Sequence, residues 1–311
     1  MLDVRRLVLL REIEARGSIA AVSRAQGISS SAISQQLAKL ESDVGMRLLE
    51  QSGRTVHLTE VGRRLAEQTG RIVALLEHAE SDLEQRRDRV QGVVRVSAFS
   101  TFALRYLPEL VSRLQRTHPD VVVEFSQADP EQSVETVAGR RADVAVIDEY
   151  EQIPHQIDVS MTRTHLLREV IGAWAPRPLT DFADLKSMPW VFEPSGSDAA
   201  LWATRLCRIA GFEPQVRFES PDLRVHQSLA ASGLAAAFLP EMLFDAPGAN
   251  LQRPAHPVRW PHPGGAELHR DVYAVVRRGA QNRPAVAAVL GHLVDITAQP
   301  SADGAMGATD R

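Results

Sequence analysis

The sequence has little that covalent or redox chemistry could use. Cys207 is the only cysteine among 311 residues, which excludes an internal disulfide and a zinc site built from several cysteines. It lies in an apolar stretch and is expected to be a small core residue. No run of eighteen apolar residues occurs, and no charged start leads into an apolar signal segment. We therefore expect a soluble, cytoplasmic protein.

The sequence also lacks the common motifs of enzymes. It has no G-x-S-x-G elbow for a nucleophilic serine, no P-loop, and no G-x-G-x-x-G after a strand. Its ten histidines are scattered. The three closest in sequence, His256, His262 and His269, lie in or beside a proline-rich loop without the paired spacing of metal ligands. We therefore expect no enzyme activity, no cofactor and no metal.

Charge is distributed unevenly along the chain. Residues 1–57 hold eight Arg or Lys against six Asp or Glu, a net +2, which leaves −6 for the rest of a chain whose total is −4. A protein that coats nucleic acid along its whole surface is therefore excluded. A mildly basic N-terminal part on an acidic remainder is compatible with a regulator that touches DNA at one end. With 44% hydrophobic residues, the chain can form two or three domains.

Residues 18–45 predict two short helices joined by a tight turn. Ser18 caps the first helix, Gly27 permits the reversal because it has no Cβ, and Ser29 caps the second helix. Helical spacing places four apolar residues of the second helix on one stripe: Ile33, Leu37, Leu40 and Val44. The opposite face is polar and almost free of acids, which suits the major groove of DNA. A helical hairpin with a solvated face is the alternative at this point.

The flanking segments extend this pattern. Residues 2–15 predict a preceding helix, and residues 46–59 predict a β-hairpin with its turn at Ser52 and Gly53 and with Arg54 at its tip. A guanidinium at that tip could reach a phosphate or a narrow minor groove. Three helices followed by a hairpin make a winged helix-turn-helix, and this order is more specific than any one part.

Thr59 is expected to cap a long helix that runs from residue 60 to about residue 89. Its apolar residues include a run with the spacing of a coiled-coil seam: Val61, Leu65, Ile72, Leu76, Ala79, Leu83 and Val90. Nothing nearby in the chain would bury such a narrow stripe, so we expect it to pair with the same helix of a second copy. Packing against the second half of the same chain is the alternative.

From residue 91 the sequence alternates between strands and helices. Strands are predicted at 93–97, 121–125, 144–147, 168–173, 190–192, 215–219, 235–238 and 271–276. Helices are predicted at 103–117, 130–139, 182–186, 198–209, 222–232 and 283–297, with an irregular strand and loop at 246–268. This alternation predicts an α/β fold with a parallel sheet.

The whole arrangement resembles the LysR-type transcriptional regulators. The resemblance is most specific in the N-terminal part, at Gly17, Ser18, Ile28, Ser29, Ala32, Ile33, Ser34, Gln36, Leu37, Leu40, Glu41, Gly45, Leu58, Thr59 and Gly62. It continues at Leu107, Pro108, His118, Pro119, residues 141–148, Leu239 and Pro240. Ser30 and Gln51 depart from the family's pattern, which leaves the operator sequence open.

The resemblance implies a winged helix-turn-helix, a linker helix and a periplasmic-binding-protein-like effector domain in two lobes. The expected domains are 1–58 for DNA binding, 59–90 for the dimerisation helix and 91–297 for the effector domain, with a disordered tail at 298–311. Lobe I is expected at about 91–165 and 268–297, and lobe II at about 166–267. Proteins of this kind work as homodimers or homotetramers and respond to a small-molecule coinducer.

Eight residues are expected to contact double-stranded DNA. Four on the outer face of the second helix are candidates for base edges: Ser30, Ser31, Ser34 and Gln35. Ser18, Lys39 and Arg54 are assigned to phosphates, because phosphate contacts position a protein on DNA without reading its base sequence. Ser29 at the start of the helix is the eighth residue. For Ser34 a plain surface hydroxyl is the alternative. Two-fold pairing of copies implies a pseudo-palindromic operator.

The effector is expected at strand ends that feed helix N-termini, because free backbone N–H groups point outward there. Three such turns, at 98–102, 193–197 and 219–222, offer Ser100, Thr101, Phe102, Glu193, Ser195, Ser220 and Asp222. The resemblance places the first two turns in the cleft between the lobes, with Asp148 at the hinge. Helix capping is the alternative for Ser100, Ser197 and Ser220. The acids suggest a zwitterion, so an amino acid or a carboxylate is the expected effector.

We therefore predict a sequence-specific DNA-binding transcriptional regulator whose C-terminal domain senses a small molecule. One alternative is a two-lobed small-molecule-binding protein or enzyme without a DNA-binding role, which would not need residues 18–45. The other is a structural DNA-binding protein without a sensor, which would leave the α/β part without a purpose.

Overall fold

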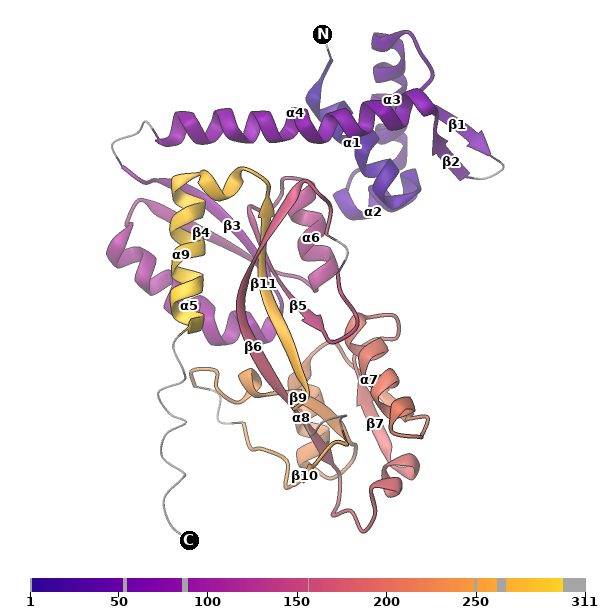
Figure 1. Cartoon of the computed structure of the whole chain (residues 1–311), viewed down its shortest axis with the longest axis vertical. Helices are drawn as coiled ribbons and strands as arrows, with labels where there is room; N and C mark the ends of the chain where they lie inside the picture. Colours follow the sequence, from indigo (N-terminus) through magenta and orange to yellow (C-terminus); the bar gives the residue numbers. More distant parts are fainter. Residues whose placement is uncertain are drawn as a thin grey trace.

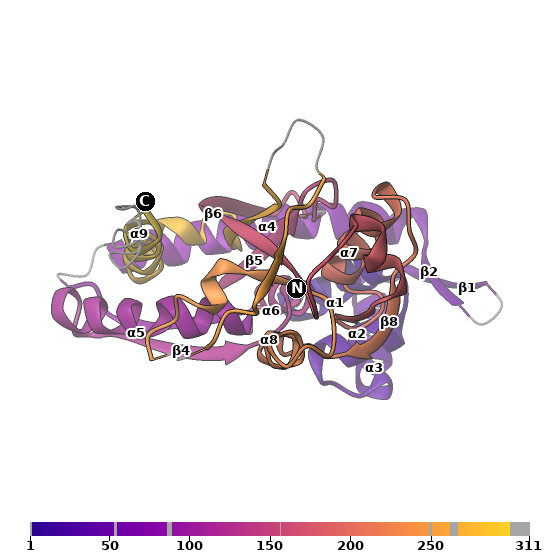
Figure 2. The same ribbon diagram turned by 90° about the horizontal axis from the view of Figure 1, so that it is seen from below.

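The computed structural model describes residues 2–52, 55–85, 89–155, 157–248, 251–261 and 267–298. Its N-terminal helices and hairpin form a small head beside one end of a long helix, and the rest of the chain forms an elongated body below (Figure 1). Viewed from below, most of the head lies behind the body, and its hairpin extends beyond the edge of the body (Figure 2). The head has its own hydrophobic core, and the largest other cores lie in the body.

Three helices build the head: α1 (Val4–Arg16), α2 (Ile19–Gln26) and α3 (Ser30–Val44). The helices are capped by Asp3, Ser18 and Ser29 respectively. Each cap's side chain accepts a hydrogen bond from a backbone N–H of the first turn. Each ends at a glycine in the left-handed region, where a Cβ atom costs about 1–2 kcal/mol. The predicted caps Ser18 and Ser29 and the predicted reversal at Gly27 are confirmed.

The core of the head lies against the apolar stripe of α3. Ile33, Leu37 and Leu40 are at most 1% exposed, and Val44 is half-buried at the end of the stripe. Each such side chain contributes about 1.5–3 kcal/mol through burial. The hairpin consists of β1 (Leu49–Ser52) and β2 (Thr55–Leu58), paired antiparallel. Its tip residues Gly53 and Arg54 lie outside the described residues.

The long helix α4 (Glu60–Gln85) starts at the predicted Thr59, whose Oγ1 accepts a hydrogen bond from the N–H of Gly62 at 3.0 Å. Glycine is required at residue 62, because an added Cβ would lie 2.2 Å from the carbonyl oxygen of Leu48. The face of α4 that packs against α1 carries Ala66, Thr69 and Val73, all buried. These residues are not those of the predicted seam.

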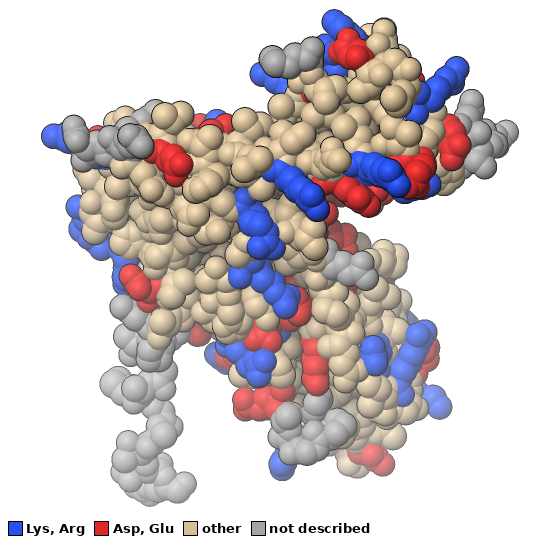
Figure 3. Space-filling model, turned by 45° about the horizontal axis from the view of Figure 1, so that its top comes forward, with Lys and Arg blue, Asp and Glu red and all other residues tan. Residues whose placement is uncertain are grey.

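The predicted seam of α4 is open only in part, because Leu65 and Ile72 are half-buried against the core of the head and Val90, beyond the helix, packs against the core of lobe I. Leu76 and Leu83 are 37% and 68% exposed, and the neighbouring Leu75, outside the predicted seam, is 68% exposed. The surface over α4 is mostly uncharged in Figure 3. The C-terminal end of the helix also touches the body. Packing on the same chain therefore accounts for part of the predicted seam and leaves Leu75, Leu76 and Leu83 exposed in the part of the chain that the structure describes.

The part of the body next to α4 is lobe I. Its strands β3 (Gly92–Ala98), β4 (Val121–Gln127) and β5 (Val144–Tyr150) run parallel, in the order β4-β3-β5. Helices α5 (Ser100–Thr117) and α9 (Pro284–Ala298) cover one face of this sheet, and α6 (Pro130–Ala138) covers the other. Alternate residues of β5 serve the two faces, which explains its continuous apolar run.

Lobe II lies at the far end of the body. It contains β7 (Pro189–Phe192), β8 (Gln215–Glu219), β9 (Ala237–Pro240) and β10 (His256–Val258), with helices α7 (Asp198–Ile209) and α8 (Leu223–Ala231). Short 3₁₀ turns lie at η1 (Phe182–Ser187) and η2 (Glu241–Leu243), and a third, η4 (Ala280–Asn282), precedes α9 in lobe I. Cys207 is fully buried in the core of lobe II, and burial raises the pKa of its thiol to about 12. The thiol is therefore held in its unreactive form.

Two long strands connect the lobes, β6 (Met161–Ala175) and β11 (His269–Arg277). β6 pairs with β11 up to Val170 and with β9 from Ile171, so the chain passes between lobes at that point. The predicted boundary at residue 165 lies a few residues earlier.

The predicted parallel pairing is found for β3 with β4 and β5 and for β7 with β8, but not for the rest of the sheet. β11 runs antiparallel to both β5 and β6, and β6 runs antiparallel to β9 and β10. The reason is that the chain leaves lobe I along one strand and returns along its direct neighbour, which needs no crossover helix. The sheet is therefore mixed, within the expected α/β class. No helix among the described residues is long and apolar enough to span a membrane.

Candidate DNA-binding and effector-binding sites

The outer face of α3 is open to solvent. Ser30, Ser31, Ser34 and Gln35 are all exposed, and so is Lys39 at its flank. The segment from residue 30 to residue 40 contains no Asp or Glu, so nothing on it repels a phosphate. Hydroxyl and amide groups on such a surface donate to and accept from base edges.

Several of the predicted DNA-contacting hydroxyls also serve the helix. Ser29 Oγ accepts from the N–H of Ala32 at 3.3 Å and lies 3.1 Å from Ser31 Oγ, and Ser34 Oγ donates to the carbonyl of Ser30 at 2.9 Å. The half-buried Ser18 caps α2 through the N–H of Ala21. Each hydroxyl oxygen retains capacity for a further bond. Arg54, assigned to phosphates, lies outside the described residues.

A cleft of about 220 Å³ lies between the lobes. Five of the predicted effector residues line it: Ser100, Thr101, Asp148, Glu193 and Asp222. Four more lining residues lie within the predicted turns: Phe99, Pro194, Ser197 and Pro221. The rest lie outside them, namely Gln127, Ala128, Asp129, Pro130, Glu131, Tyr150, His155, Asp198, Ala199, Leu223, Arg224 and Arg270. Four helices, α5 to α8, begin at this cleft. All three turns selected from the sequence, at 98–102, 193–197 and 219–222, therefore contribute residues to this cleft.

Three predicted residues do not line the cleft. Phe102 is 3% exposed and packs against Phe99 and Tyr106 in the core of lobe I, because it lies on the inner face of α5. Ser195 points to solvent at its turn. Ser220 is used locally, since its Oγ accepts from the N–H of Asp222 at 3.1 Å. The capping alternative holds for Ser197, which caps α7, but not for Ser100 or Ser220.

Arg270, on β11, is the main residue that the sequence reasoning missed. Its buried guanidinium donates to Asp148 at 2.6 Å, to Glu169 at 2.7 Å and to Thr101 Oγ1 at 3.1 Å. Glu169 also accepts from the N–H of Met242 at 2.6 Å. These hydrogen bonds thus connect β5, β6 and β11 with η2. The sequence does hold a signal for this residue, because the alternation of side chains along β11 places Arg270 on the same buried face as Val272.

The cleft carries more acid than base. Its acids are Asp129, Glu131, Asp148, Glu193, Asp198 and Asp222, against Arg224, Arg270 and His155. Arg270 is matched by Asp148 and Glu169, Arg224 lies 3.3 Å from Asp222, and His155 lies 3.4 Å from Asp198. Burial raises the pKa of the Glu193 carboxyl to about 8, and Asp148 acts in the same direction. Glu193 is therefore largely neutral at pH 7.

We expect this carboxyl to make the protein less stable as pH rises from about 5 to 8. Between its ordinary pKa of 4.5 and its folded pKa of about 8 the folded state holds a proton that the unfolded state lacks. Folding stability therefore falls by up to about 1.4 kcal/mol per pH unit across this window. Thermal unfolding of the wild type and of Glu193→Gln between pH 5 and 9 measures the effect.

The stability advantage of Glu193→Gln over the wild type should grow with pH across that window. Glu213→Gln, at an exposed ion pair of lobe II, serves as the control and should show no such growth. An equal difference between Glu193→Gln and the wild type at pH 5.5 and 8.5 would contradict a buried, protonated carboxyl at this position.

Two helix starts at the cleft have no side-chain cap. Neither the N-cap residue Phe99 of α5 nor the N-cap residue Asp129 of α6 makes a side-chain capping bond, and both line the cleft. By contrast, Ser197 caps α7 and Asp222 caps α8. The lobe I wall therefore offers N–H groups that suit a carboxylate, while the opposite wall carries Glu193 and Asp222.

A second, smaller cavity of about 30 Å³ adjoins the cleft and shares five lining residues with it: Tyr150, Glu193, Ala199, Leu223 and Arg270. Its other walls are mostly apolar: Ile171, Val191, Phe192, Trp202, Ala203, Phe238 and Pro240, with His226. This annex has room for a small apolar group. Among the described residues, no group of three His, Cys, Asp or Glu side chains is placed to hold a metal ion.

A winged helix-turn-helix head joined by a long helix to a two-lobed, ligand-binding body defines a ligand-responsive transcription factor. Family models match both parts: residues 4–63 match the "Bacterial regulatory helix-turn-helix protein, lysR family", and residues 87–298 match the "LysR substrate binding domain". The chain therefore belongs to the LysR family of bacterial transcriptional regulators, and the resemblance seen in the sequence is confirmed.

Known proteins agree with this assignment. The transcriptional dual regulator GltC of Bacillus subtilis is 26% identical over 250 residues, covering 78% of this chain and 82% of GltC. The transcriptional activator IlvY of Salmonella typhimurium is 26% identical over 231 residues, covering 72% and 77%. CbnR, a LysR family regulator of known structure, is 20% identical over 94% of this chain and all of CbnR, with a TM-score of 0.50. A full-length OxyR variant from Pseudomonas aeruginosa is 18% identical over 94% and 95%, with a TM-score of 0.59.

Membership settles the class of function. The protein is a DNA-binding transcriptional regulator with an effector-binding domain, and not an enzyme. LysR regulators bind operator DNA and small-molecule effectors and form oligomers. The α/β fold with a winged helix-turn-helix is that of full-length LysR proteins.

Proposed function

We propose that two copies of this regulator pair along the exposed seam of α4 and present two α3 helices to a pseudo-palindromic operator in the cytoplasm. Ser30, Ser31, Ser34 and Gln35 would read base edges, and phosphates would be held by Ser18, Ser29, Lys39 and Arg54. The support is the open, acid-free face of α3 together with apolar side chains on α4 that the described residues leave exposed. Selecting bound fragments from the source genome tests this, and purified protein that ignores every fragment at low salt would reject it.

We further propose that the effector is an α-amino acid rather than a simple carboxylate. Its carboxylate would bind the free N–H groups at the starts of α5 and α6, and its ammonium would lie beside Glu193 and Asp222. Its side chain would point toward the apolar annex. The observation that carries this proposal is that one cleft holds uncapped helix starts on one wall and the carboxyl groups of Glu193 and Asp222 on the other.

A thermal-shift screen tests the effector proposal. The twenty standard amino acids are compared with acetate, succinate and the corresponding amines at equal concentration. An amino acid with a small apolar side chain should raise Tm, and neither its amine nor its acid alone should match it, because each satisfies only one wall. Stabilisation should be larger at pH 8 than at pH 6, since the ammonium pairs best with an ionised Glu193.

Variants at the two walls make the test specific. Glu193→Gln should remove most of the amino acid's stabilisation, whereas Glu213→Gln, on the surface of lobe II, should not. Stabilisation by carboxylates alone, or by no amine-bearing compound, would reject this effector class and leave the DNA-binding proposal untouched.

A further inference from the structure

Basic side chains of the head point toward acidic side chains of lobe I. In α1, Arg11 Nη2 lies 3.2 Å from Asp158 Oδ1 and donates to Ser160, just before β6. Arg16 binds Glu12 in its own helix at 2.8 Å and also Glu135 near the end of α6. The side chains of Arg11 and Arg16 are only 15% and 14% exposed, so this contact covers them and they are not available to DNA.

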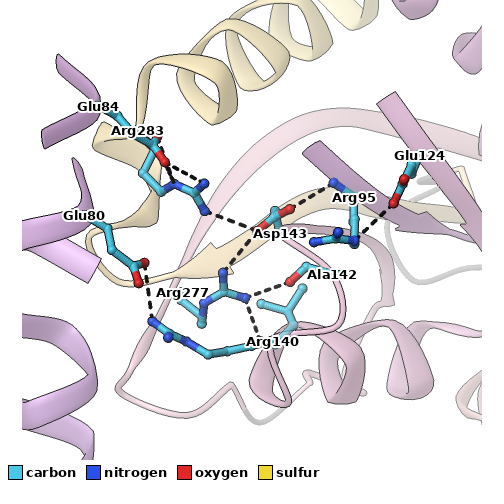
Figure 4. Close-up of polar contacts among 10 residues, drawn as sticks. Glu80, Glu84, Arg95, Glu124, Arg140, Ala142, Asp143, Arg277 and Arg283 are labelled. Carbon is cyan, nitrogen blue, oxygen red and sulfur yellow. Dashed lines mark hydrogen bonds and ion pairs between the residues drawn. The ribbon is translucent and has the colours of Figure 1, made fainter. Parts of the chain in front are cut away.

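A second group joins the end of α4 to lobe I (Figure 4). Arg283, before α9, binds Glu84 through Nε and Nη2 at 2.8–3.1 Å, and its Nη1 lies 3.4 Å from Asp143. Asp143 also binds Arg277 at 3.2 Å. Beside this group, Glu80 of α4 lies 3.7 Å from Arg140. Opposite charges gather along the border between head and body in Figure 3.

Helix α6 lies between these contacts and the cleft. Its first residues, Pro130 and Glu131, line the cleft, whereas Glu135 and Arg140 at its other end meet Arg16 and Glu80. With nine residues, α6 is about 13 Å long. It is anchored on the sheet by the fully buried Ser133, whose Oγ lies 2.9 Å from Ser97 Oγ. The wall of the cleft and the docking surface of the head therefore belong to one short, fixed helix.

We propose that these ion pairs dock the head and α4 on lobe I as one unit, so that lobe I fixes the orientation of α3. Docking leaves the outer face of α3 exposed, and so it orients the head rather than blocking it. When the cleft closes, lobe II then moves relative to lobe I, α4 and the head, which stay together. In an assembly of two copies, this docking sets the spacing between the two α3 helices.

Charge reversal in the full chain tests the docking. Glu135→Arg faces Arg16 with a like charge and should undock the head, whereas Arg16→Glu with Glu135→Arg restores opposite charges. Glu213→Arg breaks an exposed ion pair of lobe II and is the matched control. Amide hydrogen exchange of residues 4–16 and 130–138 should become at least about fivefold faster in Glu135→Arg and return toward wild-type rates in the double variant. The control should exchange like the wild type, and unchanged exchange in Glu135→Arg would overturn the proposal.

Spacing between half-sites gives a second measurement, which rests on the proposed function. The probes are duplexes with two copies of a selected half-site, at the natural spacing and with five extra base pairs. The wild type should discriminate against the longer spacing, and Glu135→Arg should lose about five- to tenfold of that discrimination. Unchanged discrimination would show that docking does not set the spacing. Faster exchange without binding to any duplex would contradict the proposed operator and leave the docking intact.

Discussion

Replacing Ser34 by glutamate is expected to lower the affinity for selected operator fragments at least a hundredfold. Ser34 lies in the second turn of α3 on its exposed face, where a recognition helix approaches bases and phosphates. A carboxylate there removes a hydrogen bond worth about 1–3 kcal/mol and adds repulsion by nearby phosphates. A total of about 3 kcal/mol corresponds to the expected hundredfold loss.

The matched control carries the same substitution two turns further along the helix. Ser42→Glu changes an exposed serine of α3 near its C-terminal end, away from the part that enters the groove. It should bind within a few-fold of the wild type when both are titrated by fluorescence anisotropy at about 100 mM salt. Equal binding by Ser34→Glu and the wild type would mean that this face of α3 does not meet DNA.

Arg270→Met is expected to destabilise the body by about 3–5 kcal/mol, because it leaves Asp148 and Glu169 buried without a counter-charge. For a body of this size the Tm should fall by roughly 10 °C. The measurement is thermal or urea unfolding followed by circular dichroism. Arg208→Met, which breaks an exposed pair with Glu213, should leave the transition where it is.

Neutralising the two carboxylates that Arg270→Met leaves without a counter-charge provides the complementary measurement. Asp148→Asn and Glu169→Gln added to Arg270→Met should recover a substantial part of the lost stability, since the neutral side chains no longer need a cation. A single Arg270→Met variant as stable as the wild type would contradict the structural role given to this arginine.

The head could be predicted almost completely because its signals are local. Each cap, each terminating glycine and the stripe of α3 involve residues within one helix, and Ser18, Gly27 and Ser29 do what their positions indicate. The strands and helices of the body were found for the same reason. The main element-level departures are ends that shift by a few residues, as in β6, which begins seven residues earlier than predicted.

The cleft between the lobes could be predicted only in part because its key contacts join distant residues. Arg270 meets Asp148 and Glu169 across 122 and 101 positions in the sequence, which no local spacing reveals. Phe102 follows two residues that do line the cleft, but the helical turn carries it into the core. The antiparallel course of β11 likewise depends on which strand the chain returns to, and strand–helix alternation does not encode that.

The place of β11 in the sheet has a consequence for how the chain is made. This strand, residues 269–277, lies in the middle of the sheet between β5 and β6, so each of these strands lacks its neighbour on that edge until most of the polypeptide has been synthesised. The head and the part of α4 that packs against it are complete within the first quarter of translation. A nascent or prematurely terminated chain therefore has a folded DNA-binding head before its effector-binding domain can complete its sheet.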